Sequence, residues 1–187
     1  MMGGLNSNGA AFDGGEFHED GQSTTHIKLT NSANVNGSAA GTNGMYCLAF
    51  TSIEGYSKFD IFEGNDPSNY ETDDNGTFVY CGFKPAFVMY KPIDNTGNWL
   101  IFDNKRNKGG TDNYNGNTIW ERIYANTNDY QTSATENAID FLSNGFQIKF
   151  NDATLCDTWN EDGNLYIFAA FAAQPFITSK GVPCTAV

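Results

Sequence analysis

The chain has 187 residues, which suits one sizeable domain plus an additional segment, and its 15 Phe and 9 Tyr supply enough large side chains to fill a core. Its formal net charge of −12 excludes a general affinity for nucleic acid and for anionic membrane surfaces, because like charges repel. The acid excess instead favours solubility and opposes non-specific association.

Residues 1–44 differ from the rest of the chain in composition. They are rich in Gly, Asn and Ala and contain few large apolar side chains, so they cannot build a core of their own. Their first part has neither a basic region nor an apolar run, and is therefore not expected to be a signal peptide. We expect an extended N-terminal arm over 1–44, ordered by contact with a neighbouring subunit or else a loose tail, followed by one domain over 45–187.

Turn-forming dipeptides punctuate the whole chain. Asn-Gly occurs six times and Asp-Gly three times, and both pairs tolerate the positive φ of tight turns. The runs between them are short and rich in β-forming residues, and no window shows a long apolar stripe of helical period. The expected strands are 26–30, 45–51, 58–62, 77–82, 86–91, 99–103, 118–124, 138–142, 146–150 and 165–171, and the nearest helical candidate is the turn at 133–137.

Many short strands at this spacing predict an all-β fold, an antiparallel β-sandwich of jelly-roll-like form. The clearest local pattern is a hairpin over 138–150, in which apolar residues alternate with polar ones on either side of Asn144-Gly145, the expected turn. The longest apolar run, 165–173, is too short to span a bilayer and suits a buried strand, so no membrane insertion is expected.

Two segments of the chain resemble each other. Residues 43–59 and 163–181 both begin with Gly and Asn, continue through a Tyr and an Ala-Phe pair, and end with an aromatic residue and Ser-Lys. A repeated closing strand indicates the tail of one unit followed by one complete unit. Chance similarity between two buried strands is the alternative.

No cofactor or metal is expected. The four Cys are scattered without a CxxC pair, which argues against zinc; Cys47, Cys81 and Cys156 lie among apolar neighbours and are expected to be reduced and buried. Two acidic segments, 65–76 and 151–164, contain the oxygen ligands that calcium prefers, but neither has EF-hand spacing and solvated turns explain them equally.

The sequence offers little support for catalysis, so we do not expect an enzyme. Both histidines, His18 and His26, lie in or beside the arm, and there is no Gly-x-Ser-x-Gly elbow or phosphate-binding Gly-rich loop. A glycosidase needs only two facing carboxyls at a set separation, which a sequence does not reveal, so polysaccharide cleavage remains an open alternative.

Several residues near polar loops are candidates for contacts with a ligand or another subunit. Asp103 and Arg106 are expected to pair and to pin the loop that follows them, since an Asp–Arg pair is geometrically specific. Aromatic side chains in such loops either stack on sugars or cover an edge of the sandwich. The candidates for ligand or interface contact are Trp99, Arg106, Trp120, Tyr130 and Trp159.

Several ordered blocks of this chain resemble a domain family found in virion proteins of tailed bacteriophages, especially those of cyanobacteria and other aquatic bacteria. The shared pattern is a Gly-Phe-x-Pro-x-Phe-Val strand, a turn with Lys, a Trp strand ending in Asp-x-x-Arg, a hairpin, and a final Tyr/Ala/Phe strand with Pro-Phe. It covers roughly residues 45–180. In this chain the positions are Gly82, Phe83, Pro85, Phe87, Val88, Lys91, Trp99, Asp103, Arg106, Asp140, Phe141, Ser143, Gly145, Phe146, Tyr166, Ala170, Phe171, Pro175 and Phe176.

The resemblance implies a structural protein on the virion surface, made in the host cytoplasm. The family domain often occurs in tandem within longer fibre-like proteins, whereas this chain is short and carries an arm. We therefore expect a capsid-surface decoration or cement protein that docks through its arm onto other virion proteins, the major capsid protein or tail proteins, and self-associates as a homotrimer. The alternative is a receptor-binding tail fibre or spike module that contacts a host surface glycan.

Overall fold

The computed structural model describes residues 25–28, 49–65, 76–106, 118–133, 137–150 and 158–174. Of the predicted arm, only 25–28 fall within this part. The strands found in the described residues are β1 (Ser57–Glu63), β2 (Phe78–Tyr80), β3 (Pro85–Pro92), β4 (Leu100–Asp103), β5 (Thr118–Ile119), β6 (Glu121–Tyr124), β7 (Thr132–Ser133), β8 (Asn137–Leu142), β9 (Gly145–Phe150) and β10 (Leu165–Ala172).

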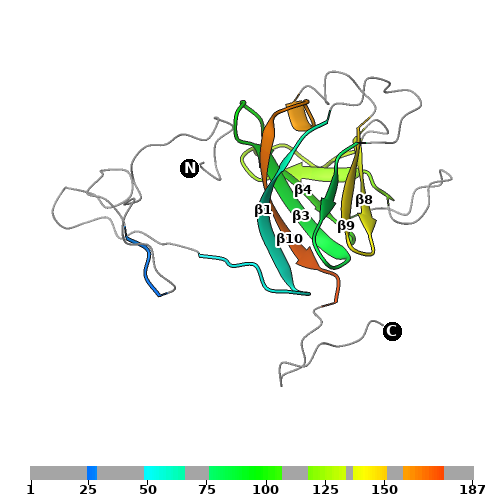
Figure 1. The fold of residues 1–187 in the computed structure, drawn as a ribbon. Helices are drawn as coiled ribbons and strands as arrows, with labels where there is room; N and C mark the ends of the chain where they lie inside the picture. The colour runs from blue at the N-terminus through cyan, green and yellow to red at the C-terminus, as the bar shows by residue number, and fades with distance from the viewer. Residues whose placement is uncertain are drawn as a thin grey trace.

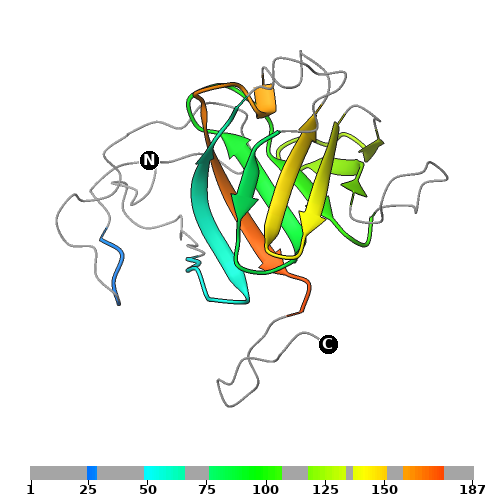
Figure 2. The same ribbon diagram turned by 45° about the vertical axis from the view of Figure 1, so that its right-hand side comes forward.

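The strands form two antiparallel sheets that pack face to face (Figures 1 and 2). The larger sheet has the order β1-β10-β3-β4-β6-β7 and the smaller one the order β2-β9-β8-β5. The chain passes repeatedly from one sheet to the other, as in β1 to β2 to β3 and again in β4 to β5 to β6. The predicted all-β sandwich is confirmed.

Aromatic rings dominate the core between the sheets. The ring of Phe62 stacks on Tyr166 with 5.0 Å between centroids and meets the edge of Tyr90 at 5.6 Å. It also meets Phe146 of β9 at 6.0 Å, which joins the larger sheet to the smaller one. Offset and edge-to-face rings of this kind add to the stabilisation that burial of their area provides. This aromatic cluster therefore contributes to holding the two sheets together.

The predicted hairpin over 138–150 is present as β8 and β9, with Ile139 opposite Ile148 and Phe141 opposite Phe146. The turn, however, consists of Ser143 and Asn144, because Gly145 already pairs with Leu142 of β8 and with Tyr80 of β2. A Cβ on Gly145 would lie 2.1 Å from the carbonyl oxygen of Val79. The glycine is needed for the close approach of two strands, and the expectation that it forms the turn was wrong.

Several predicted elements differ from the structure. Residues 26–28 and 49–51, expected in strands, are exposed and form none; residues 29–30 and 45–48 lie outside the described part. The strand expected over 118–124 is two strands, β5 and β6, which belong to different sheets on either side of Trp120. Of the turn candidate at 133–137, residues 134–136 lie outside the described part and the end residues 133 and 137 belong to strands; helical residues are found at 158–159. Whether a segment forms a strand depends on whether another strand lies beside it, and the local sequence pattern does not contain that information.

The loop between β3 and β4 is fastened by a buried lysine. Lys91 is 1% exposed, and its Nζ donates a hydrogen bond to the carbonyl oxygen of Gly97 at 3.1 Å. Burial lowers the pKa of the Lys91 ammonium. On the same loop, Asp94 Oδ2 accepts a hydrogen bond at 2.9 Å from the backbone N–H of Leu165, at the start of β10. These bonds hold the loop against the end of the larger sheet.

Cys81 is a free, buried thiol, as predicted, while Cys47, Cys156 and Cys184 lie outside the described residues. Burial raises the pKa of the Cys81 thiol from 9.0 to about 12, and nearby Lys58 opposes this slightly. The folded chain therefore keeps this proton at a pH where the unfolded chain loses it. The stability that Cys81 contributes is complete below pH 9.0 and is lost as the pH rises toward about 12.

Cys81→Ala should remove this loss. We expect the free energy of unfolding of the wild type to fall, relative to the variant, by up to about 1.4 kcal/mol for each pH unit above 9. Urea unfolding of both proteins at several pH values measures the difference between their free energies of unfolding. Both contain the same tyrosines, so the effect of tyrosine ionisation on stability cancels in this difference. A constant difference from neutral pH to pH 11 would contradict the assignment.

Candidate functional site

Strand β10, and β3 up to Tyr90, are apolar on both faces. Val88 and Tyr90 of β3 point into the core, whereas Phe87 and Met89 alternate with them and lie on the outer face of the larger sheet. Met89 pairs with Ala169 of β10, which lies on that same outer face. The outer face of an antiparallel sheet is ordinarily polar, because it meets water. An apolar outer face indicates a surface that meets another apolar surface.

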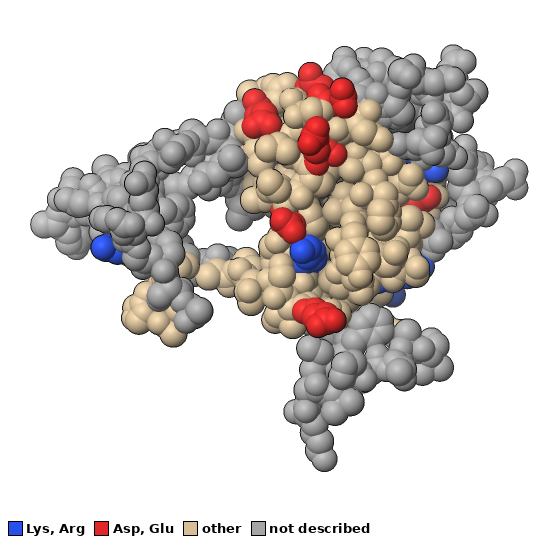
Figure 3. All heavy atoms as spheres, viewed as in Figure 1, with Lys and Arg blue, Asp and Glu red and all other residues tan. Residues whose placement is uncertain are grey.

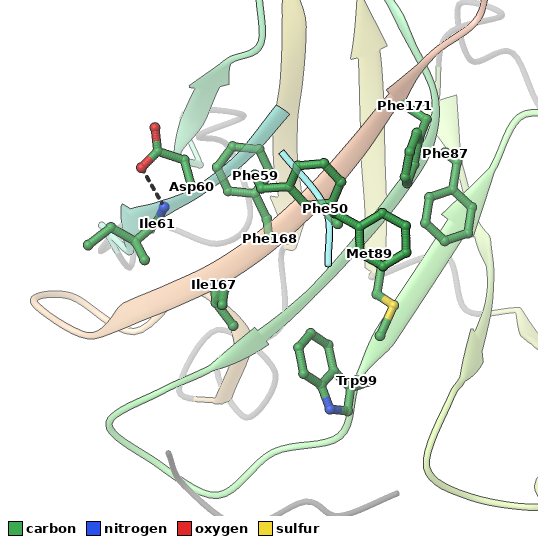
Figure 4. A pocket seen from close by; sticks show the side chains of 11 residues that line it. Phe50, Phe59, Asp60, Ile61, Phe87, Met89, Trp99, Ile167, Phe168 and Phe171 are labelled. Carbon is green, nitrogen blue, oxygen red and sulfur yellow. Dashed lines mark hydrogen bonds between the residues drawn. The ribbon is translucent and has the colours of Figure 1, made fainter. Parts of the chain in front are cut away.

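This outer face contains a hollow of about 670 Å³ (Figure 4). Its aromatic side is a group of rings in which Phe171 meets the edges of Phe50 at 6.5 Å, Phe59 at 5.6 Å and Phe87 at 5.9 Å. At the other side the side chain of Met89 extends toward Trp99 (Figure 4). The lining also includes Asp60, Ile61, Ile167, Phe168 and Ala169.

Phe50 reaches the hollow from the segment before β1, and local hydrogen bonds hold that segment in place. The chain turns back tightly at 53–57, where the backbones of Ile53 and Ser57 exchange two hydrogen bonds of 2.9 Å. Ser57 Oγ donates to the carbonyl oxygen of Thr51 at 3.0 Å. Phe50 is stacked on Phe59 with 5.5 Å between centroids, yet it remains 64% exposed. The ring is thus positioned while most of its surface faces water.

Ionisable groups are scarce among the described residues that line the hollow. Asp60 is the one such residue in that set, and it forms an ion pair with Lys58 at 2.8 Å. The hydrogen bond from Lys58, together with one from the backbone N–H of Ile61, lowers the pKa of the Asp60 carboxyl. A general acid or base needs a pKa near the working pH, so this carboxylate is poorly suited to proton transfer. What the hollow provides is apolar surface.

The predicted site residues do not gather in one place. Trp99 lines the hollow, and its backbone N–H donates to Asn126 Oδ1 at 2.8 Å. Trp120 is half-buried between β5 and β6. Trp159 is 9% exposed and stacks on Tyr124 at 6.3 Å, a position that packing accounts for. Tyr130 is 85% exposed in the loop before β7.

Asp103 and Arg106 meet in an ion pair with 2.9 Å between Asp103 Oδ2 and Arg106 Nε. Asp103 Oδ1 also accepts a hydrogen bond from the backbone N–H of Arg106 at 2.8 Å. A second guanidinium nitrogen donates to Gln131 Oε1 at 3.3 Å, so Arg106 connects the turn after β4 to the segment before β7. This geometry orders two adjacent loops.

Sequence reasoning missed most of the hollow, including Phe50, Phe59, Phe87, Met89, Ile167 and Phe171. A signal was present in the runs "AFVMY" and "LYIFAAFA", in which apolar residues occupy both alternating sets of positions. Such a strand is apolar on both faces. The set of positions that includes Val88 and Tyr90 predicts the side chains that point into the core. The set that includes Phe87 and Met89 predicts an apolar outer face.

The described parts of the two acidic segments considered for calcium are in contact at one end of the sandwich, where β1 ends and β10 begins. Asn160 Nδ2 donates to Asn65 Oδ1 at 3.0 Å, which joins them directly. Acidic side chains gather at this end, at the top of the view in Figure 3. Residues 66–75 and 151–157, which make up most of both segments, are outside the described part. Within the described ranges, no three His, Cys, Asp or Glu side chains are grouped to hold a metal ion.

One family model matches residues 4–175, and its description is "Domain of unknown function (DUF7483)". The match extends across the predicted boundary between residues 44 and 45. No curated protein and no solved structure matches the sequence. A search of the described residues for helices long and apolar enough to cross a membrane finds none.

Proposed function

The chain belongs to the family described as a domain of unknown function (DUF7483), and we propose that it is a structural protein of a bacteriophage particle that works by binding other virion proteins. The observation that carries a binding role is the apolar outer face of β1, β10 and β3 with its hollow. Phe50, Ile61 and Ile167 on this face are 64%, 53% and 41% exposed. Contiguous exposed apolar surface is typical of sites that contact another protein.

The assignment to a phage particle is supported by the resemblance described above. Its sequence blocks fall on strands and on one ion pair of the sandwich. Phe87 and Val88 lie in β3, and the Tyr/Ala/Phe block forms β10. Asp103 and Arg106 form the ion pair at the end of β4. The resemblance therefore includes the strands whose outer face forms the hollow. This correspondence favours a shared mode of assembly.

We propose further that the protein decorates the capsid surface. In this proposal the arm, residues 1–44, docks onto the major capsid protein, and the sandwich domains associate with each other, in threes according to the resemblance. The protein is made in the host cytoplasm and ends on the virion surface. An arm that becomes ordered on docking adds contact area at a cost in conformational entropy.

Deleting residues 1–25 should abolish attachment to capsid shells, because the deletion removes more than half of the arm and leaves the described sandwich intact. The measurement is the occupancy of purified shells after incubation with the wild type or the deletion variant, read by gel densitometry. Equal thermal midpoints of the two proteins serve as the folding control. Unchanged occupancy by the deletion variant would refute docking through the arm.

A second candidate is a receptor-binding fibre or spike module, and the observation that favours it is Tyr130, which is 85% exposed beside the loop that Arg106 orders. An exposed aromatic ring suits stacking on a sugar. Binding of the isolated protein to host cells or envelope glycans, weakened by Tyr130→Ala without unfolding, would favour this role over decoration.

A further inference from the structure

The backbone of β2, at the edge of the smaller sheet, is paired with β9 on one side. The carbonyl oxygen of Thr77 accepts a hydrogen bond at 3.1 Å from the N–H of Ile148, on β9. Just past β2, the N–H of Cys81 donates at 2.9 Å to the carbonyl oxygen of Asn144, in the turn between β8 and β9. Hydrogen-bonded residues alternate with non-bonded ones along an antiparallel ladder. Val79, midway between Thr77 and Cys81 in the same register, therefore also directs its N–H and C=O groups toward β9.

Phe78 and Tyr80 consequently direct their N–H and C=O groups toward the open edge of β2. Among the described residues, none binds these groups from that side. The side chains of Phe78 and Tyr80 are aromatic rings on the outer face of the smaller sheet, 45% and 65% exposed. A row of unpaired backbone donors and acceptors at a sheet edge is a template for one more strand.

The β1 edge of the larger sheet, by contrast, is protected by side chains. Ser52 Oγ accepts a hydrogen bond from the N–H of Phe59 at 2.9 Å and donates one to its carbonyl oxygen at 3.2 Å. Asp60 Oδ1 accepts from the N–H of Ile61 at 3.0 Å. Edge strands whose outward groups are engaged in this way resist pairing with another chain. Protection of this edge, beside an open edge at β2, favours β2 as a place where a strand binds.

The larger sheet extends past β2 and leaves a ledge beneath its open edge. In Figures 1 and 2, β1 lies beyond β2 on the side away from β9. Lys58 and Asp60 occupy the same alternating set of β1 positions as Phe62, so they belong to the inner face of the larger sheet. Phe62 is 8% exposed in the core, whereas the side chains of Lys58 and Asp60 are 34% and 51% exposed. The smaller sheet therefore covers β1 at Phe62 and leaves the ledge, Lys58 and Asp60, uncovered.

We infer that β2 accepts an extended segment of another polypeptide as an additional strand of the smaller sheet, lying over the ledge. The outward N–H and C=O groups of Phe78 and Tyr80 bind its backbone. The side chains that fall beside the rings of Phe78 and Tyr80 are apolar, and those on the opposite face, over Lys58 and Asp60, are polar. This goes beyond the proposed function, because such an edge would serve a decoration protein and a fibre module alike.

A second copy of this chain is poorly suited to supply the strand from its own β2. Antiparallel pairing of two β2 strands about a twofold axis keeps the same sheet face on the same side, so both larger sheets would lie beneath the joint. Each β1 extends past its own β2 and would enter the space of the other copy's larger sheet. A segment that carries no second sheet meets no such obstacle.

Amide hydrogen exchange of the full chain, followed by NMR with and without a synthetic peptide, tests the inference. The peptide alternates Val and Thr along its length and carries Lys at both ends. When Val lies beside the exposed rings, the Val amides face β2 and the Thr amides face away, so N-methylation of one set or the other gives two matched control peptides. Tyr80→Ala and Tyr80→Pro both remove the ring, but only Pro removes the outward N–H, a change that edge strands tolerate.

In the free chain we expect slow exchange at Val79 and fast exchange at Phe78 and Tyr80. The peptide should slow exchange at Phe78 and Tyr80 by about tenfold or more. N-methylation of Thr should preserve this protection, and N-methylation of Val should abolish it. Tyr80→Pro should bind the peptide about tenfold more weakly than Tyr80→Ala does, the effect of one lost hydrogen bond. Circular dichroism checks that both variants are folded.

Slow exchange at Phe78 and Tyr80 in the free chain would mean that the edge is already occupied, and protection that grows with protein concentration would make a second copy the occupant. Either result would overturn the inference. A peptide that protects neither amide at millimolar concentration, or equal binding of the two methylated peptides, would overturn it as well. Shell occupancy scores the proposed function separately, so the two failures are distinguishable.

Discussion

Phe62→Ala should lower the free energy of unfolding by about 3–5 kcal/mol, the range found when a large aromatic side chain is removed from a core. Phe62 is 8% exposed, and its ring contacts Tyr90, Tyr166 and Phe168 of its own sheet. Its contact with Phe146 is one of those that hold the smaller sheet against the larger one. The substitution therefore leaves a cavity between the two layers, which the surrounding strands cannot close without breaking their pairing.

Urea unfolding monitored by circular dichroism measures this effect. Phe78→Ala is the matched control, because Phe78 lies on β2 of the smaller sheet but is 45% exposed. The control should change stability by less than about 1 kcal/mol, as is usual for surface positions. A Phe62→Ala variant no less stable than Phe78→Ala would mean that the sheets are not held together at this cluster.

Gly145→Ala should lower the free energy of unfolding by about 3 kcal/mol, at the upper end of the cost of overpacking. The added Cβ would lie 2.1 Å from the carbonyl oxygen of Val79 and 3.0 Å from its carbonyl carbon. These are backbone atoms of β2, so no side chain can rotate to make room. Relief requires β2 and β9 to separate at the pairs that join Val79 to Phe146 and Tyr80 to Gly145.

Gly163→Ala separates this clash from the general effect of removing a glycine. Gly163 has φ +77, but no atom lies within 4 Å of the position of its Cβ. Only the left-handed backbone conformation opposes the substitution there, at a cost of about 1–2 kcal/mol. Thermal unfolding of both variants gives the comparison. If Gly163→Ala were the more destabilised, the close approach of β2 to Gly145 would be wrong.

The fold class was predictable from sequence because its signals are local. Asn-Gly and Asp-Gly turns and short alternating runs located β1, β3, β4, β8, β9 and β10 to within a few residues. The pairing of strands far apart in the chain was not predictable. β10 lies between β1 and β3, and this order arises from burial of residues such as Phe62, Tyr90 and Tyr166 in one core. A pattern within one strand carries no information about which strand will lie beside it.

The hollow was less predictable than the fold. Trp99 was selected for its position beside a loop, and it does line the hollow. Phe50 was assigned to a strand, whereas the turn at 53–57 places it over the outer face, which no local pattern indicates. Trp159 was selected by the same reasoning as Trp99, but it packs in the core against Tyr124. An aromatic residue near a polar loop has the same sequence appearance in both situations.

We propose that this chain is a structural component of a phage particle, located on its capsid. Labelling of intact, purified particles with an antibody against the sandwich domain, viewed by electron microscopy, tests it most directly. We expect label distributed over the head. Particles that carry no label would contradict the claim, and label confined to the tail would replace decoration by the fibre or spike role.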